Sequence, residues 1–322
     1  MKGKKVLIVG ASGFVGYKLA LELCQGNEVY GLARFREQNI KEQLESGGVI
    51  CIAKDMSKES LDDLPGDFDY VFNELIMTEF KSYEERQNEA LALNAHLVGR
   101  LMDHCRNAQG FIQTSTNMLY PPSSGTVGWR EDENVRPGET YPLSKFTGEV
   151  VATFCSTLWD IPTCILRLGH PYSEEGGAVY MLADRIARRE PIAVNKRQLR
   201  AYNPIYLSDY IRYSILAADF CAVPPRVMNV GGIEIVPQLE LLERLGKALS
   251  IEPIIVDKDA PRLPLTEPTW VTDITLLIKL MGEPLVLLEE GIKRVSERIK
   301  DLQSIGATTE IVDGKVRVVQ GE

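Results

Sequence analysis

The stretch that decides the fold is Lys4-Lys5-Val6-Leu7-Ile8-Val9-Gly10-Ala11-Ser12-Gly13-Phe14-Val15-Gly16. A short apolar run leads directly into three glycines spaced three apart, and a helix is expected to follow from Phe14 to Cys24. Glycines permit a tight turn and let a pyrophosphate approach the backbone, while a helix N-terminus offers free N–H groups to its phosphates. We therefore predict a dinucleotide-binding unit whose cofactor contacts come from Gly10, Ser12, Gly13, Phe14, Val15 and Gly16.

The composition narrows the class of protein. The chain has 322 residues, of which 44% are hydrophobic, and a net charge of −9, so no basic surface for nucleic acid is indicated. No apolar run approaches the roughly 20 residues that cross a bilayer. The six cysteines form no CxxC pair, and the three histidines show no metal-ligand spacing. We predict a cytoplasmic protein without metal, disulfides, or nucleic-acid or membrane partners.

Strand-like and helix-like segments alternate through the first half of the chain. Apolar runs at 6–9, 28–33, 49–53, 69–73, 110–114 and 162–167 are expected to be strands. Helical periodicity is clearest at 13–25, 87–106 and 141–159. This alternation predicts an α/β fold, a Rossmann-type doubly wound parallel sheet, with a smaller, mostly C-terminal substrate domain.

The domain boundaries follow from where this alternation loosens. We assign residues 1–170, with about 202–232, to an NADP-binding Rossmann domain, and residues 171–201 and 233–304 to a substrate-binding domain. Further helices are expected at about 237–249, 272–281 and 286–302. Residues 305–322 are predicted to form a C-terminal β-hairpin tail, because Asp313-Gly314 separates two β-rich runs.

The end of the second predicted strand bears on the choice of cofactor. NAD sites usually have an acid there for the ribose 2′-hydroxyl, but this chain has Ala33 followed by Arg34. A guanidinium can bind a 2′-phosphate, so we predict NADP in preference to NAD. The alternative is that Arg34 and Arg36 are ordinary solvated charges. Asp55 is predicted to bind the adenine amine, or else to cap a helix at Ser57.

The segment Tyr141-Pro142-Leu143-Ser144-Lys145 places a phenol and an ammonium on one face of a predicted helix. An ordinary tyrosine has a pKa of about 10 and needs support from a nearby cation to act as a base. With that support, Tyr141 could exchange a proton with a hydroxyl or carbonyl while hydride moves. Hydroxyls near Thr116, at the end of the fifth predicted strand, could orient the reacting oxygen, or could merely close a turn.

Taken together, these residues resemble the extended short-chain dehydrogenases/reductases, the NAD(P)-dependent epimerase/dehydratase family. The similarity covers residues 4 to about 300 and includes the glycine triplet, Asn94, Thr116 with Tyr120, and Tyr141 with Lys145. It implies that Thr116, Tyr141 and Lys145 are catalytic and that Tyr141 and Lys145 also contact the cofactor. The further cofactor-binding residues are then Arg34, Asp55, Met56, Leu75, Asn94, Thr114 and His170. The substrate-binding residues are Thr116, Asn117, Tyr120, His170, Arg200 and Arg262.

Departures from the family pattern restrict which reactions we expect. Asn117 and Met118 stand where family 4,6-dehydratases have Asp-Glu, so dehydration is not expected. Asn73-Glu74-Leu75-Ile76 replaces a common His-Leu-Ala-Ala and brings bulkier residues near the cofactor. His170 replaces an asparagine and could be a substrate ligand or a structural histidine. Tyr202 occupies a usual phosphate-binding arginine position, with Arg200 two residues earlier, whereas Arg262 matches the other such position.

The resemblance predicts an NAD(P)-dependent oxidoreductase or epimerase acting on a sugar-like hydroxyl or carbonyl, with a nucleotide sugar as substrate. The choice between an epimerase and a ketoreductase stays open, although Arg34 leans toward a reductase. The alternative from another class is a non-catalytic NADP-binding regulator or scaffold. The resemblance also implies a homodimer paired through helices at about 87–106 and 141–159, with a monomer as the alternative.

Overall fold

The computed structural model describes residues 1–76, 86–121, 127–195, 200–257, 270–312 and 315–320. They form two compact units. Unit 1 comprises Met1–Leu119, Pro137–Arg167 and Ile211–Met228, and unit 2 comprises Tyr120–Arg136, Leu168–Tyr210 and Asn229–Glu322. The domain boundaries expected from the sequence remain a prediction.

Unit 1 contains most of a seven-stranded sheet with the order β12-β6-β5-β4-β1-β2-β3. Its strands, in chain order, are β1 (Lys5–Val9), β2 (Glu28–Ala33), β3 (Ile50–Ala53), β4 (Tyr70–Asn73), β5 (Gly110–Thr116), β6 (Thr163–Leu168) and β12 (Arg226–Val230). β1 pairs in parallel with β2 and β4, and β4 pairs in parallel with β5. Every residue of β5 is buried, as expected for a strand covered on both faces. The predicted Rossmann-type sheet is confirmed.

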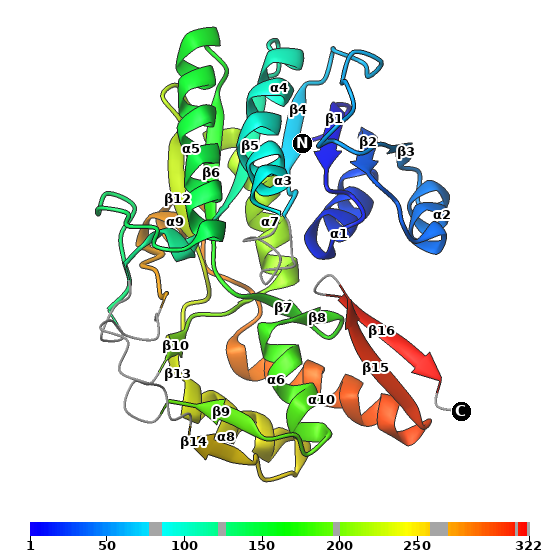
Figure 1. The fold of residues 1–322 in the computed structure, drawn as a ribbon, viewed down its shortest axis with the longest axis vertical. Coiled ribbons are helices and arrows are strands. Elements are labelled where there is room, and N and C mark those ends of the chain that lie inside the picture. The colour runs from blue at the N-terminus through cyan, green and yellow to red at the C-terminus, as the bar shows by residue number, and fades with distance from the viewer. Residues whose placement is uncertain (77–85, 122–126, 196–199, 258–269, 313–314, 321–322) are drawn as a thin grey trace. The chain divides into compact units, whose positions relative to one another are not determined.

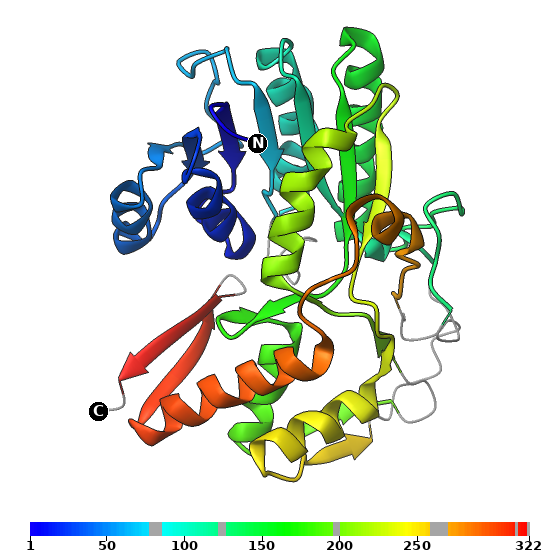
Figure 2. The ribbon, with the colours of Figure 1, turned by 180° about the vertical axis from the view of Figure 1, so that it is seen from behind.

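Helices cover both faces of this sheet. In chain order they are α1 (Phe14–Leu23), α2 (Gln38–Ser46), α3 (Gln87–Leu91), the π-helix η2 (Ala92–His96), α4 (Leu97–His104), the 3-10 helix η3 (Asn117–Leu119), α5 (Thr140–Trp159), α7 (Leu207–Ala217) and the 3-10 helix η4 (Ala218–Phe220). Figure 1 shows α4 and α5 in front of the sheet, and Figure 2 shows α7 in front of its other face. Among the described residues, no helix combines the length and the apolar character that crossing a bilayer requires.

Unit 2 contains short strands and three helices around its own apolar core. The strands are β7 (Pro171–Ser173), β8 (Gly176–Gly177), β9 (Ile192–Val194), β10 (Ala201–Tyr202), β11 (Ile205–Tyr206), β13 (Val236–Pro237), β14 (Ile255–Asp257), β15 (Ala307–Val312) and β16 (Lys315–Gln320). The helices that supply the core are α6 (Ala178–Ala187), α8 (Gln238–Leu249) and α10 (Leu288–Ser304). A shorter helix, α9 (Thr275–Met281), precedes α10.

The C-terminal segment belongs to a sheet of unit 2. β15 and β16 pair antiparallel, and β16 also pairs with β8, so the sheet has the order β11-β7-β8-β16-β15. The Thr309 hydroxyl donates to the Asp184 carboxylate on α6 at 2.7 Å, which ties β15 to the core helices. Asp313-Gly314, the predicted turn, lies outside the described residues.

The glycine-rich turn shows why its spacing is required. Gly10 has a φ of +86°, and its N–H donates to the Leu32 carbonyl at 2.8 Å, which joins the turn to β2. The Gly13 N–H donates to the Gly10 carbonyl, also at 2.8 Å. A Cβ added at Gly16 would lie 2.3 Å from the Gly10 oxygen, so α1 packs too closely on the turn to admit a side chain there.

We expect Gly16→Ala to lower the free energy of unfolding by about 1–3 kcal/mol, because the turn must shift to admit the methyl group. Gly66→Ala is the matched control, since its Cβ would meet its nearest atom, the His104 oxygen, at 3.7 Å. Urea denaturation of both variants measures the effect. A Gly16→Ala protein as stable as the Gly66→Ala protein would contradict the packing argument.

Candidate active site

The amino end of α1 has the features of an anion-binding site. Its N-cap residue, Gly13, supplies no side-chain hydrogen bond, and the first turn contains no acidic residue. The first N–H groups of the helix are therefore left for a ligand, and the positive end of the helix dipole faces it. Ser12, Phe14 and Val15 are half-buried around this turn. These residues fit the pyrophosphate of a dinucleotide, which is the role predicted for them.

Tyr141 and Lys145 lie on one buried face of α5. The helix begins at Thr140, so Pro142 falls in the first turn, where no backbone N–H is needed for the helix. Both side chains are buried, whereas Leu143 between them is exposed. Tyr141 packs with Ala90 and Met118. The predicted phenol and ammonium therefore share a face, one turn apart.

A chain of hydrogen bonds fixes the start of α5. The Asn94 amide donates to the Ser144 hydroxyl at 2.9 Å, and that hydroxyl donates to the Tyr141 carbonyl at 2.7 Å. Asn94 lies in η2, and a Cβ at Gly148 would lie 2.1 Å from its backbone oxygen, so η2 and α5 touch through their backbones. The buried Asn94 Oδ1 has no hydrogen-bond partner among the described residues. An orphaned buried acceptor of this kind fits a group supplied by a ligand.

The carboxyl end of β5 presents the predicted hydroxyls. The Thr116 Oγ1 accepts a hydrogen bond from the Met118 N–H at 3.2 Å at the start of η3. Ser115 Oγ is buried without a partner among the described residues. Asn117 is also buried. Thr114 is the third hydroxyl, and it donates to the Glu74 carboxylate at 2.7 Å.

The pKa of Lys145 is shifted far from its ordinary value. Only 2% of this residue is exposed, and burial lowers the pKa of its ammonium to about 8, while Glu74 and Glu149 oppose that shift by favouring the charged form. Glu149 itself accepts two hydrogen bonds from Arg167, at 2.9 and 3.1 Å. With a pKa of about 8, most of the Lys145 ammonium keeps its charge at neutral pH.

Arg34 and Asp55, the residues predicted to bind the adenosine part of the cofactor, each interact with other side chains. Arg34 Nη1 lies 3.8 Å from Glu89 Oε1, and the same carboxylate accepts two hydrogen bonds from Arg86, at 2.6 and 2.8 Å. Asp55 Oδ1 accepts hydrogen bonds from the Ser57 hydroxyl and N–H, at 2.6 and 3.1 Å.

These Ser57 bonds lower the pKa of Asp55, and Arg34 contributes to that shift. The bonds support the capping alternative for Asp55, although residues 56–58 form a turn and not a helix. Met56 points into the core, and the Leu75 N–H reaches the Asn73 amide oxygen at 3.4 Å.

The remaining predicted residues lie in unit 2. His170 is half-buried in a left-handed conformation, with its ring edge-on to Tyr202. Desolvation and then Arg200 lower its pKa to about 4, so the imidazole is neutral at physiological pH. The Tyr120 hydroxyl donates to Asn229 Oδ1 at 2.8 Å. Arg262 lies outside the described residues.

Two residues near the predicted site residues were not predicted from the sequence. Ser144 links Asn94 to the Tyr141 backbone, and nothing in a lone serine at that position indicates such a bond. Glu74 was noted only as one of several bulkier residues after the fourth strand. Its charge, directly after an apolar strand, was the signal that could have identified it, because a carboxylate buried there needs partners.

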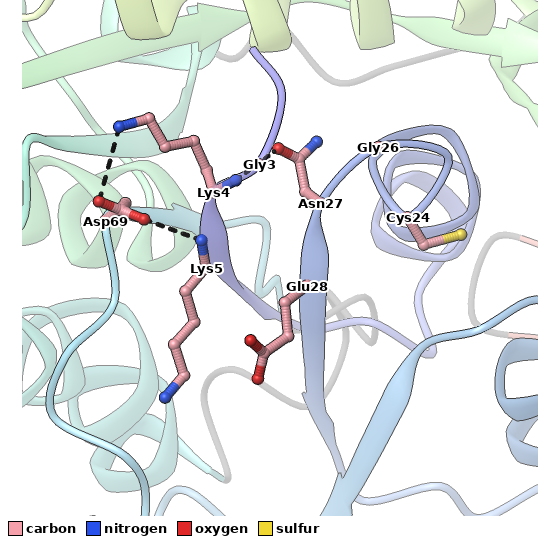
Figure 3. A pocket seen from close by; sticks show the side chains of 8 residues that line it. All are labelled: Gly3, Lys4, Lys5, Cys24, Gly26, Asn27, Glu28 and Asp69. Atoms are coloured by element: carbon pink, nitrogen blue, oxygen red, sulfur yellow. Dashed lines mark hydrogen bonds and ion pairs between the residues drawn. The ribbon is translucent and has the colours of Figure 1, made fainter.

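A pocket of about 510 Å³ lies elsewhere in unit 1, at the amino ends of β1 and β2 (Figure 3). The Lys4 N–H donates to Asn27 Oδ1 at 3.1 Å, and the Lys5 N–H donates to Asp69 Oδ2 at 2.9 Å. Lys4 Nζ is also 3.7 Å from Asp69 Oδ1. Ligands of open α/β sheets bind outside the carboxyl ends of the strands, so this pocket is not part of the candidate active site.

Comparisons with known proteins agree with this geometry. The model of the NAD dependent epimerase/dehydratase family matches residues 6–231. A Bacillus subtilis (strain 168) protein named uncharacterized UDP-glucose epimerase YtcB is 24% identical, over 71% of this chain and 77% of its own length. UDP-glucuronate 4-epimerase 5 of Arabidopsis thaliana is 25% identical, over 91% of this chain and 74% of its own.

Solved structures show the same fold. UDP-glucuronic acid 4-epimerase from Bacillus cereus, in complex with UDP-glucuronic acid and NAD, superposes with a TM-score of 0.79 at 24% identity, covering 92% of this chain and 99% of that one. UDP-N-acetylglucosamine 4-epimerase from Methanobrevibacter ruminantium M1, in complex with UDP-N-acetylmuramic acid, gives 0.82 at 19% identity, with 94% and 99% coverage. The resemblance predicted from the sequence is confirmed: this chain is an NAD(P)-dependent enzyme of the extended short-chain dehydrogenase/reductase type and belongs to the NAD dependent epimerase/dehydratase family.

Proposed function

We propose that this protein is an epimerase of nucleotide sugars in which Tyr141 is the acid and base. The observation that carries the proposal is the common buried face of Tyr141 and Lys145 on α5, in the same unit as the glycine-rich turn. Relatives named as UDP-glucose and UDP-glucuronate epimerases support it. So do neighbours solved with UDP-glucuronic acid and with UDP-N-acetylmuramic acid.

The proposed roles follow from the chemistry of the side chains. The Tyr141 phenolate takes the proton of the sugar hydroxyl, and the Lys145 ammonium stabilises that phenolate by its charge. Gly10, Gly13 and Gly16 would hold a dinucleotide, whose nicotinamide would supply the hydride acceptor and donor that the sugar carbon needs. Once the ketone presents its other face, Tyr141 gives the proton back to the oxygen. Thr116 orients that oxygen, and Asn117 and Met118 have no acid or base group for dehydration.

The substrate contacts proposed for unit 2 come from His170, Tyr120 and Arg200. A neutral His170 can donate or accept a hydrogen bond without adding charge, and Arg200 offers a guanidinium for a diphosphate. Arg262 is proposed for the same diphosphate from its sequence position alone.

We propose NAD as the cofactor, although Arg34 alone predicted NADP. The Glu89 carboxylate beside Arg34 would face a 2′-phosphate with a like charge, which disfavours its binding. The Bacillus cereus structure was solved with NAD, and so was MoeE5 with UDP-glucose. Both observations favour a cofactor without the 2′-phosphate.

We also propose a homodimer that pairs through α5. Leu143, Val150, Phe154 and Leu158 are exposed by 48%, 52%, 63% and 57%, and their spacing places them on one face of the helix. Such a contiguous apolar face is typical of a protein–protein contact.

The six cysteines are all free, which fits the cytoplasmic location predicted from the sequence.

We expect the purified protein to convert a UDP-sugar to its 4-epimer with no net change in absorbance at 340 nm, because the cofactor is regenerated in each turnover. Tyr141→Phe should lower the rate by about 10²- to 10⁴-fold, since the proton acceptor is lost. Assays with UDP-glucose, UDP-glucuronic acid and UDP-N-acetylglucosamine, read by NMR of the sugar, measure both.

Tyr30→Phe is the matched control for Tyr141→Phe. The Tyr30 hydroxyl donates to Glu28 at 2.7 Å on β2, away from the proposed machinery, so this variant should keep the parent rate. Undiminished turnover by Tyr141→Phe would overturn the proposal. Net consumption of NADH or NADPH by the parent protein would replace the epimerase with a reductase.

The cofactor proposal predicts that the parent protein binds NAD more tightly than NADP. Glu89→Gln removes the negative charge beside Arg34 and should raise the affinity for NADP by about two- to fivefold, the value of a partly exposed ion pair. Isothermal titration calorimetry with both nucleotides tests this, with Glu22→Gln on α1 as the control. Tighter binding of NADP by the parent would restore the preference predicted from Arg34.

The dimer proposal predicts that the parent protein has twice the chain mass in light scattering. The double variant Phe154→Glu with Leu158→Glu should be monomeric, because burying two carboxylates in an apolar contact is costly. Ile305→Glu, at a site exposed by 74% in unit 2, is the control and should leave the mass unchanged. A monomeric parent protein would exclude the dimer.

A further inference from the structure

Two cysteines that the proposed chemistry does not use flank an antiparallel bridge in unit 1. Thr163 in β6 and Ala222 after η4 form this bridge, and each N–H donates to the other residue's carbonyl, at 2.9 and 3.1 Å. Such an exchange defines a hydrogen-bonded pair, and the next pair along the two segments is a non-hydrogen-bonded pair, with Cα atoms about 4.5 Å apart. By this register, the next pair is Cys164 and Cys221.

The backbone of both cysteines suits this pairing. Cys164 lies within β6, and Cys221 has extended backbone angles, with a φ of −58° and a ψ of 140°. Cα atoms that a disulfide joins are about 4.4–6.8 Å apart, a range that includes the spacing of a non-hydrogen-bonded pair. The register therefore brings the two backbones within the distance that a disulfide can span.

The two side chains lie on the same face of the sheet. Ile165 belongs to the apolar core that α4 and α5 complete, and successive residues of a strand point to opposite faces. Cys164 therefore points to the other face, which α7 covers (Figure 2). The Cys221 sulfur lies 3.5 Å from the carbonyl oxygen of Ala217, the last residue of α7. Both thiols thus occupy the layer between the sheet and α7.

Gly110 places the Cys221 sulfur by a separate observation. Phe111 packs in the core with α4 and α5, so its neighbour Gly110 faces the side of α7. A Cβ built on Gly110 would lie 3.2 Å from Cys221 Sγ. The Phe111 N–H donates to the Pro162 carbonyl at 2.9 Å, so β5 runs directly beside β6 at this level. The Cys221 sulfur therefore lies against the pair of strands that includes Cys164.

We propose that Cys164 and Cys221 are a redox-sensitive pair of thiols that a peroxide closes to a reversible disulfide. Both are free in the structure; Cys221 is partly exposed and meets the peroxide, whereas Cys164 is buried. The Cys221 thiol is oxidised to a sulfenic acid, and one water leaves. The Cys164 thiol then attacks that sulfur, the S–S bond forms, and a second water leaves. Two electrons and two protons from the thiols thus reduce the peroxide.

Burial sets how readily the pair reacts. Desolvation raises the pKa of Cys221 to about 12, and hydrogen bonds from the Phe111 and Cys164 backbones oppose this shift. Burial also raises the pKa of Cys164. The thiolate is the reactive form of cysteine, so the pair should react more slowly than an exposed thiol and stay reduced until the oxidant persists. The pair includes neither Tyr141 nor Lys145, and its formation does not depend on the proposed function.

Thiol counting and mass spectrometry test the disulfide in the parent protein. The six thiols titrated in urea should decrease by two after incubation with hydrogen peroxide, and the intact mass should fall by about 2 Da. Peptides joined through Cys164 and Cys221 should appear without reductant and separate after dithiothreitol. An unchanged thiol count, a different pairing, or a sulfinic acid at Cys221 without the cross-link would overturn the proposal.

Variants separate this pair from the other cysteines. Cys221→Ser should form no cross-link at the same dose of peroxide, whereas Cys51→Ser, at another partly exposed cysteine, is the matched control and should still form it. Because the disulfide restricts the unfolded chain, the oxidised parent should unfold at a urea concentration about 1 M higher, and dithiothreitol should reverse this shift. A shift of equal size in oxidised Cys221→Ser would contradict the proposal.

Discussion

Parallel pairing of β1, β2, β4 and β5 is the constraint on which the rest of unit 1 depends. It places the carboxyl ends of these strands along one edge of the sheet, although the residues there are far apart in the sequence. Gly10, Glu74 and Thr114 meet at that edge for this reason. The same pairing leaves β5 buried on both faces, so each polar side chain at its end must find a partner inside the protein.

Local patterns predicted the first six strands of the parallel sheet and the long helix α5. The apolar run at 28–33 coincides with β2, and the helix expected at 141–159 begins one residue earlier, at Thr140. Strand and helix periodicities are local properties, and glycine spacing constrains a local turn. The identity of Tyr141 and Lys145 as candidates likewise required only four residues of sequence and a position after the fifth strand.

Local sequence patterns did not predict the contacts between segments that are distant in the sequence. Glu74 and Ser214 are separated by 140 positions, and no pattern in either segment indicates their hydrogen bond. The pairing of Arg34 with Glu89 also joins distant segments, and it changes the interpretation of an arginine that on its own indicated a 2′-phosphate site. The π-helix η2 was also missed, because the apolar periodicity of the segment 87–106 predicts an ordinary helix and does not indicate an extra residue per turn.

The backbone contact between Gly148 and Asn94 has a consequence for how this site tolerates change. Since two main chains touch there, any side chain at position 148 would push η2 away from α5 and break the relay through Ser144 to Tyr141. Gly148, which has no side chain, thus helps to hold the backbone of Tyr141 in place. Position 148 should therefore admit glycine alone, because only a hydrogen atom fits between the two helices there.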